Sequence, residues 1–171
     1  EFDERAVEAH LSRLQRIGGG CPGLREIDLG QPYAPDSPAA APAPAREATP
    51  ARGLNNFPVQ LHLVNPQAAA FRGADLLIAA DCVAFAMPAF HTELGGSRAV
   101  VSGCPKLDDV AAYVEKLTEL FTAAAPRSIT VARMEVPCCG GLTQIVRHAA
   151  QLAGLDVPIV VRVIGAEGAM R

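Results

Sequence analysis

The chain has 171 residues and a formal net charge of −3, with 50% hydrophobic and 19% charged residues. This profile is typical of a soluble globular protein with room for one ordinary domain and its appendages. Nucleic acid is not an expected partner, because no Lys/Arg stripe is present and the two Tyr and six Phe are accompanied by no Trp. No apolar stretch approaches the ~20 residues of a membrane-spanning helix, so we expect no membrane contact.

The first residues, Glu1–Arg5, are acidic and polar and do not resemble a signal peptide, which favours a cytoplasmic protein. The chain begins without Met, so we expect a piece of a longer protein. Residues 4–17 have the spacing of an amphipathic helix, and Gly18–Gly20 end it. In residues 34–52, thirteen of nineteen are Ala or Pro, which predicts an extended, mobile linker that proteases cut first.

These features divide the chain into three predicted parts. An N-terminal amphipathic helix occupies residues 1–20, and a Cys-Pro-Gly segment with the Ala/Pro-rich linker occupies 21–52. A cysteine-rich α/β domain that binds a metal or cluster occupies 53–171.

Strand and helix patterns alternate through the predicted domain. Apolar or alternating runs predict strands at 59–64, 76–80, 99–102, 129–132 and 159–164. A helix carrying apolar residues from Val110 to Phe121 has Asp108 and Asp109 as candidate N-caps, and a second helix runs from Gly140-Gly141 to a stop at Gly154. This order predicts an α/β fold, a three-layer flavodoxin-like sandwich with about five mainly parallel strands.

Four of the five cysteines follow predicted strands. Cys82 follows the second strand, Cys104 the third, and Cys138 and Cys139 follow the fourth after a short loop. The carboxyl ends of parallel strands share one edge of the sheet, where open α/β folds bind ligands. We therefore expect these four thiols to form one metal or cofactor site, the alternative being that they are small buried core residues.

The spacing favours an iron–sulfur cluster over zinc. Structural zinc sites usually use close pairs such as C-x2-C, whereas Cys138 and Cys139 are adjacent and their side chains diverge. A four-iron cluster is wider, and neighbouring thiolates can bind different irons. A [4Fe–4S] cluster is thus the predicted cofactor and zinc the alternative.

Several other residues near these loops are weaker candidates. Cys21, in Cys-Pro-Gly before the linker, is either an extra ligand or a plain cysteine, and His91 is either a ligand or proton donor or a surface histidine. Asp81 and Glu135 flank the cysteines as proton-handling groups or turn caps. His62, inside the first predicted strand, is expected to be a hydrogen-bonded core histidine.

Six segments carry a resemblance to a known family. They are Glu1–Leu11, Gly20–Gly23, Pro58–Val64, Ala80–Ala86 (ADCVAFA), Gly103–Asp109 (GCPKLDD) and Arg133–Leu142 (RMEVPCCGGL). Together they resemble the C-terminal region of bacterial ferredoxin-type iron–sulfur proteins, in which a two-cluster ferredoxin domain comes first. The ferredoxin signature C-x2-C-x2-C-x3-C is absent from this chain. Cys104 followed by Cys138-Cys139-Gly140 is also similar, more weakly, to the Cys-Cys-Gly cluster motif of heterodisulfide reductase subunits.

The resemblance implies an iron–sulfur protein with an electron-transfer or redox-sensing role. The implied partners are the ferredoxin domain of a longer natural chain and a further redox protein, and a homo-oligomer is left open. Two alternatives remain: a thiol/disulfide oxidoreductase that uses the Cys138-Cys139 pair, and a structural zinc-binding interaction domain. The sequence does not decide whether the protein is an enzyme, although a redox carrier is favoured.

Overall fold

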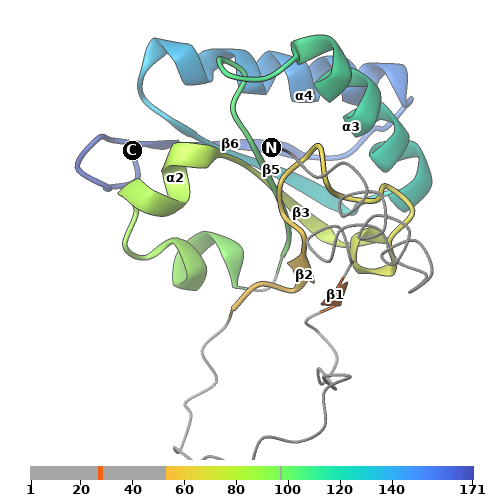
Figure 1. Cartoon of the computed structure of the whole chain (residues 1–171), viewed down its shortest axis with the longest axis horizontal. Helices are drawn as coiled ribbons and strands as arrows, with labels where there is room; N and C mark the ends of the chain where they lie inside the picture. Colours follow the sequence, from red (N-terminus) through yellow and green to blue (C-terminus); the bar gives the residue numbers. More distant parts are fainter. Residues whose placement is uncertain (1–26, 29–52, 97) are drawn as a thin grey trace, which may run out of the picture.

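A parallel sheet of four strands is the centre of the computed structural model, which describes residues 27–28, 53–96 and 98–171 (Figure 1). The strands are β3 (Asp75–Ala80), β4 (Ala99–Gly103), β5 (Ser128–Met134) and β6 (Ile159–Ile164), in the order β4-β3-β5-β6. A separate antiparallel pair joins β1 (Ile27–Asp28) to β2 (Asn56–Phe57). The predicted N-terminal helix, Cys21 and the Ala/Pro-rich linker lie outside the described residues.

Helices cover both faces of the sheet. The helix α3 (Val110–Ala124) and the helix α4 (Gly140–Leu152) lie on one face, and α2 (Asp81–Ala86) and the π-helical turn η3 (Phe90–Gly95) lie on the other (Figure 1). Two 3-10 turns, η2 (Ala69–Phe71) and η4 (Pro137–Cys139), complete the elements. The predicted three-layer α/β sandwich is therefore confirmed.

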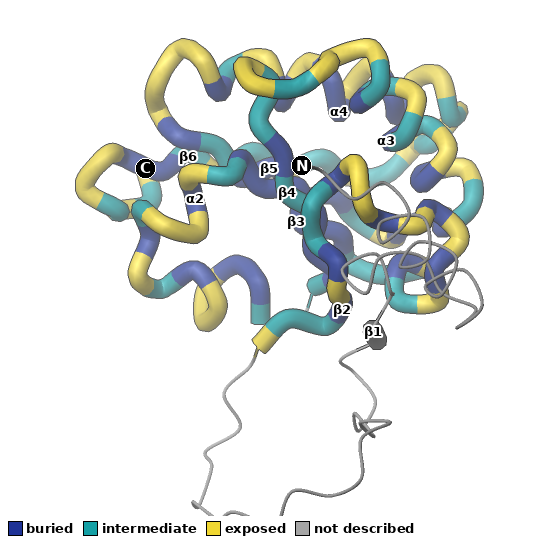
Figure 2. The backbone as a smooth tube through the Cα atoms, viewed as in Figure 1, coloured by how far each residue is buried: buried dark blue, intermediate teal, exposed yellow. Residues whose placement is uncertain are grey.

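The central strands are buried because helices exclude water from both sides. In β3 every residue from Leu76 to Ala80 is buried, as the uninterrupted apolar run predicts for a central parallel strand (Figure 2). Fully buried Tyr113, Leu117 and Leu120 of α3 contribute to the same core as the strands. The folded core thus fixes the positions at which β3, β4 and β5 end.

The prediction of a strand at residues 59–64 is wrong, and within the described residues the sheet has four strands where about five were expected. Only Gln60 forms a bridge, parallel to Ser102 of β4. The Gln60 carbonyl then accepts the N–H groups of Leu63 at 2.8 Å and Val64 at 3.1 Å, which closes a turn. Pro58 lacks an N–H donor, so the extended segment has little room to form a ladder before this turn.

Asn56 fastens the segment before this bridge to the edge of β4. Its side chain is fully buried, its Nδ2 donates to the carbonyls of Val100 at 2.9 Å and Pro58 at 3.0 Å, and its Oδ1 accepts the N–H of Val100 at 2.7 Å. The amide therefore takes the place of a neighbouring strand at Val100, which satisfies backbone groups that would otherwise be buried without partners.

Of the two candidate N-caps of α3, Asp109 is the cap. Its Oδ1 accepts the N–H groups of Ala111 at 2.8 Å and Ala112 at 3.4 Å, whereas Asp108 accepts the hydroxyl of Tyr113. At the end of α4, Gly154 has the positive φ of 63° that the predicted stop requires. Both helix boundaries thus follow from local side-chain and glycine chemistry.

Replacing Asp109 with alanine should lower the free energy of unfolding by about 1 kcal/mol, because two N–H groups of the first turn of α3 lose their acceptor. Urea unfolding of the two proteins measures this difference. Asp156→Ala, which changes an exposed carboxylate in the loop after α4, is the matched control and should change stability little. An equal loss in both variants would contradict a specific capping role.

Among the described residues, no helix is long and apolar enough to cross a membrane.

Candidate functional site

The order of the strands creates a switch point between β3 and β5. The chain passes from β3 outward to β4, and then returns to β5 on the other side of β3. The loops that leave the carboxyl ends of β3 and β5 therefore run to opposite sides, which opens a crevice where open α/β sheets bind ligands. Cys82 follows β3 and Cys138-Cys139 follow β5 at this point.

All four predicted cysteines lie at the carboxyl edge of the sheet. Cys82 is exposed in the first turn of α2, Cys104 is half-buried directly after β4, Cys138 is exposed in η4 and Cys139 is buried beside it. Ala80 of β3 is paired with Gly103 of β4, so Cys82 and Cys104 leave the edge close to a registered pair. The common edge expected from the sequence is present.

Two of the other cysteines influence the pKa of the Cys139 thiol. Burial is the largest cause that raises its pKa above the ordinary value, and a backbone hydrogen bond with Met134 offsets part of that effect. Cys138 raises the pKa further through its charge and a side-chain hydrogen bond. Cys82 raises it through its charge. Without a cation to balance the charge, Cys139 is therefore a neutral thiol at neutral pH.

The loop that carries Cys104 lies against the loop of the cysteine pair. A Cβ atom placed on Gly141, in the first turn of α4, would be 3.8 Å from the Cβ of Pro105. The N–H of Cys104 donates to the Tyr113 hydroxyl at 3.1 Å, and this hydroxyl donates to Asp108. Burial, the largest cause, and Asp108 raise the pKa of Tyr113 far above its usual range, so the hydroxyl stays protonated and fixes the loop.

The thiols do not form a cage for a single ion. In the part of the chain that the structure describes, no three Cys, His, Asp or Glu side chains are arranged to hold a metal ion. A tetrahedral zinc site needs four ligands within about 2.3 Å of one atom. Among these residues the four thiols share an edge of the sheet without forming a site for a metal ion.

A buried hydroxyl without a partner accompanies Cys139. Thr143 lies one helical turn after Cys139, and its Oγ1 is the buried side-chain oxygen or nitrogen that lacks a hydrogen-bond partner among the described residues. Residues four apart lie on the same side of a helix, so the hydroxyl is on the side of α4 from which Cys139 projects. An unpaired hydroxyl is costly in a protein core, and a sulfur ligand would give it an acceptor.

The sequence did not identify Tyr113 or Thr143 as site residues, nor Asp108 as the hydrogen-bond partner of Tyr113. Tyr113 follows the apolar spacing of α3, which hides its hydroxyl among core residues. Thr143 interrupts the buried face formed by Leu142, Ile145 and Val146, and this polar residue on an apolar face was the available signal.

Two other predicted candidates, His91 and Glu135, contact residues other than the four cysteines. His91 is exposed in η3 and packs edge-on against Phe90, with ring centroids 5.2 Å apart. Glu135 accepts the N–H of Ala166 at 3.0 Å and pairs with Arg171 at 3.4 Å, so it holds the C-terminal loop. The prediction that His62 is a core histidine is wrong. Residues 61–63 form a turn in which His62 is exposed, and one side of its ring contacts the ring of Tyr113.

Comparison with known proteins places this geometry in a family. Residues 68–170 match the family model described as the Rossmann-like domain. The chain belongs to this family. An uncharacterized protein of Archaeoglobus fulgidus is 33% identical over 116 residues, which cover 66% of this chain and 81% of that protein. No solved structure matches the chain.

This Rossmann-like domain does not fit a dinucleotide at its first strand–helix turn. In dinucleotide-binding members of such folds, the motif G-x-G-x-x-G lets the backbone approach the pyrophosphate. Here β3 runs directly into α2, whose sequence is DCVAFA, and glycine is absent from the turn. The turn after β3 therefore lacks the glycines of a phosphate-binding loop.

Proposed function

We propose that this chain is an iron–sulfur protein in which Cys82, Cys104, Cys138 and Cys139 hold a [4Fe–4S] cluster for an electron-transfer or redox-sensing role. The observation that carries the proposal is the placement of four thiols, from three separate loops, at the carboxyl edge beside the switch point of the sheet. Thiolates on several loops are the usual ligands of such clusters.

The surroundings of the thiols support a group with sulfur atoms and negative charge. The thirteen-residue helix α4 begins directly after Cys139, and its first N–H groups and dipole favour negative charge at this end. The unpaired hydroxyl of Thr143 would gain a sulfur acceptor. When bound, the cluster supplies one-electron storage, while Tyr113 and Asp108 hold the Cys104 loop in place.

The burial and the raised pKa of Cys139 argue against an enzyme that uses the cysteine pair without a metal. Thiol–disulfide exchange needs an accessible thiolate, and low pKa values mark such cysteines. Cys139 is buried and its pKa is raised, which disfavours it as the attacking group of a vicinal pair. A cationic iron centre changes this balance, because metal binding drives the release of the thiol proton.

The proposed partners and location rest on the family resemblance of the cysteine motifs. We propose that a two-cluster ferredoxin domain precedes this region in the natural chain and exchanges electrons with the cluster in the cytoplasm. A further redox protein would then accept or donate electrons at the edge where Cys82 and Cys138 are exposed.

Reconstitution of the full chain with iron and sulfide under nitrogen tests the proposed function. We expect brown protein with broad visible absorption that bleaches on reduction, and a paramagnetic signal in one oxidation state. A colourless protein that retains zinc would instead support the structural interaction domain. Thiol-dependent disulfide reduction by colourless, metal-free protein would support the oxidoreductase.

Replacing Thr143 with valine should have opposite consequences in the two forms of the protein. In the metal-free protein the change removes a buried, unpaired hydroxyl, so the free energy of unfolding should rise by about 1 kcal/mol. In the reconstituted protein a hydrogen bond to sulfur is lost, so the midpoint potential should fall. Urea unfolding and a redox titration measure the two effects.

Thr122→Val is the matched control for this experiment. Thr122 is exposed in the last turn of α3, and its hydroxyl donates to the carbonyl of Thr118 at 2.8 Å. The control should leave the midpoint potential unchanged. A loss of stability in metal-free Thr143→Val, or an unchanged potential after reconstitution, would contradict the role given to this hydroxyl.

A further inference from the structure

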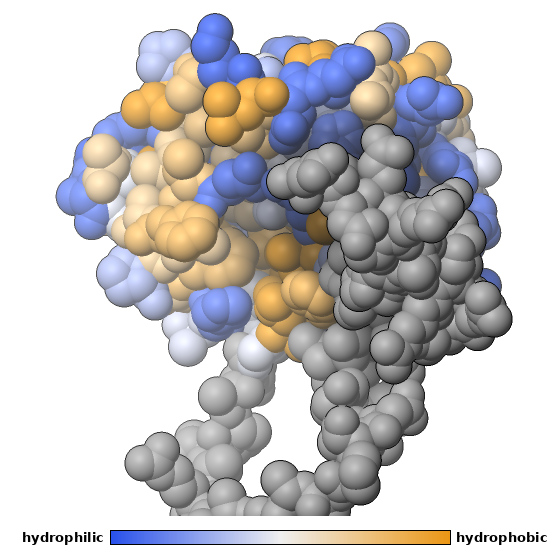
Figure 3. Space-filling model, in the orientation of Figure 1, coloured by the Kyte–Doolittle hydropathy of each residue, from blue (hydrophilic) through white to orange (hydrophobic). Residues whose placement is uncertain are grey.

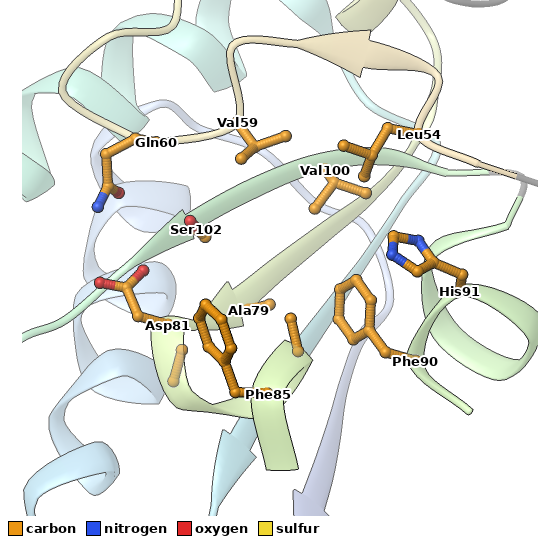
Figure 4. A pocket seen from close by; sticks show the side chains of 12 residues that line it. Leu54, Val59, Gln60, Ala79, Asp81, Phe85, Phe90, His91, Val100 and Ser102 are labelled. Carbon is orange, nitrogen blue, oxygen red and sulfur yellow. The ribbon is translucent and has the colours of Figure 1, made fainter. Parts of the chain in front are cut away.

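A cavity of about 490 Å³ opens on the face of the sheet opposite α3 and α4. Its lining comes from β3, β4, α2, η3 and the segment around Val59 and Gln60, and Figure 4 shows these side chains around a common space. The volume is within the range of small-molecule sites, roughly 300–1,000 Å³.

The walls of the cavity are apolar and form a slot. The rings of Phe85 and Phe90 stand side by side, and Leu54, Val59 and Val100 lie across the space from them (Figure 4). Phe85 is 93% exposed, and Figure 3 shows apolar side chains gathered over α2 on the same side of the molecule. A flat ring in this slot would cover an aromatic surface that otherwise faces water.

One end of the slot is polar and carries negative charge. Figure 4 shows Gln60, Asp81 and Ser102 together at this end, while His91 lies at the other end beyond Phe90. Within the described residues, the carboxylate of Asp81 and the hydroxyl of Ser102 have no hydrogen-bond partner, and Gln60 uses only its Oε1, which accepts the N–H of Leu61 at 3.0 Å.

The charges around the slot select the class of ligand. Among the described residues that line it there is neither Lys nor Arg, so a phosphate or carboxylate ligand would meet the charge of Asp81 without compensation from them. A protonated amine would instead form a charge-assisted hydrogen bond with that carboxylate and a second bond with the Ser102 oxygen. At the far end, the imidazole of His91 is suited to a hydroxyl on the ring.

We propose that this cavity binds an aromatic amine, with its ring in the slot between the phenylalanines and Val59 and Val100, and its ammonium group on Asp81. None of the four cysteines lines this cavity, and the cavity is formed without a cluster. The proposal therefore goes beyond the cluster and stands or fails separately from it.

Titration of the full-length, reduced, metal-free chain with tyramine tests the proposal by the amide shifts in nuclear magnetic resonance spectra. We expect saturable shifts confined to α2, η3 and the residues near Gln60 and Ser102, with a Kd on the order of 1 mM for so small a probe. The matched probe 3-(4-hydroxyphenyl)propionate has the same ring and chain length but a carboxylate in place of the amine. It should produce no saturable shift.

Two substitutions and one control complete the experiment. Asp81→Asn should weaken tyramine binding at least about tenfold, because the charge is removed while the shape is kept. Ala84→Leu should fill the slot and abolish binding. Asp156→Asn makes the same change of charge in an exposed loop after α4, at the opposite edge of the sheet, and should leave the affinity unchanged.

Three results would overturn the proposal. They are shifts that are absent or spread over the surface without saturation, equal binding of the amine and the carboxylate, and unchanged affinity in Asp81→Asn. The correct fold of each variant is read from the dispersion of the same spectra, so a failed variant is distinguished from a failed site.

Discussion

Replacing any one of Cys82, Cys104, Cys138 and Cys139 with alanine is expected to abolish retention of the cluster. Each thiolate closes one part of a single shell, and the binding energy of the cluster is coupled to the stability of the fold. The melting temperature of each variant after reconstitution should therefore fall to that of the metal-free protein. Iron and sulfide content, measured on protein prepared without oxygen, gives the direct readout.

Cys21→Ala is the matched control, because Cys21 is at most an exchangeable extra ligand and its loss should leave the cluster largely intact. The vicinal-thiol alternative makes a different prediction. In that case Cys82→Ala and Cys104→Ala remain redox-active without iron, whereas Cys138→Ala and Cys139→Ala do not. Full iron retention in all the variants would contradict a site shared by the four thiols.

Replacing Gly103 with alanine should destabilise the domain by about 2–3 kcal/mol. The Cβ atom added at Gly103 would overlap the hydroxyl of Tyr113 and lie 2.7 Å from its Cζ and 2.8 Å from its Cε2. Tyr113 is fully buried, so its ring has no space into which it can retreat. The same ring holds the N–H of Cys104, so the loop that presents this thiol should also shift.

Gly140→Ala provides the control for this substitution. No heavy atom lies within 4 Å of a Cβ built at Gly140, and its φ of −59° and ψ of −33° are helical. Alanine should therefore raise the free energy of unfolding by about 0.5–1 kcal/mol. Urea unfolding of both metal-free variants measures the contrast, and a Gly103→Ala protein as stable as the parent would contradict the close contact with Tyr113.

The parts of the fold that could be predicted are those with a local cause. The apolar run of β3 is buried on both faces, Asp109 caps α3, and Gly154 ends α4 with a positive φ. Residues 59–64 alternate between apolar and polar residues as a strand does, but they form a bridge and a turn, because hydrogen bonds to the Gln60 carbonyl compete with pairing to β4. That competition depends on the position of β4, which the local sequence does not contain.

For the candidate site, the sequence was enough to predict only the edge of the sheet at which the four thiols lie. Parallel strands end at a common edge, so the order of strands and cysteines along the chain was enough to bring the four thiols there. The choice between the two sides of β3, which creates the switch point, depends on the crossover to β5. The burial of Cys139, the unpaired Thr143 hydroxyl and the link from Tyr113 to Cys104 arise from packing between distant elements.

The content of iron, acid-labile sulfide and zinc in the full chain, isolated and reconstituted without oxygen, is the most direct test of the iron–sulfur proposal. The account predicts iron and sulfide in equal amounts, about four of each per chain, and no stoichiometric zinc. Five free thiols titrated in a chain that retains neither iron nor sulfide, or one zinc ion held in place of the cluster, would contradict it.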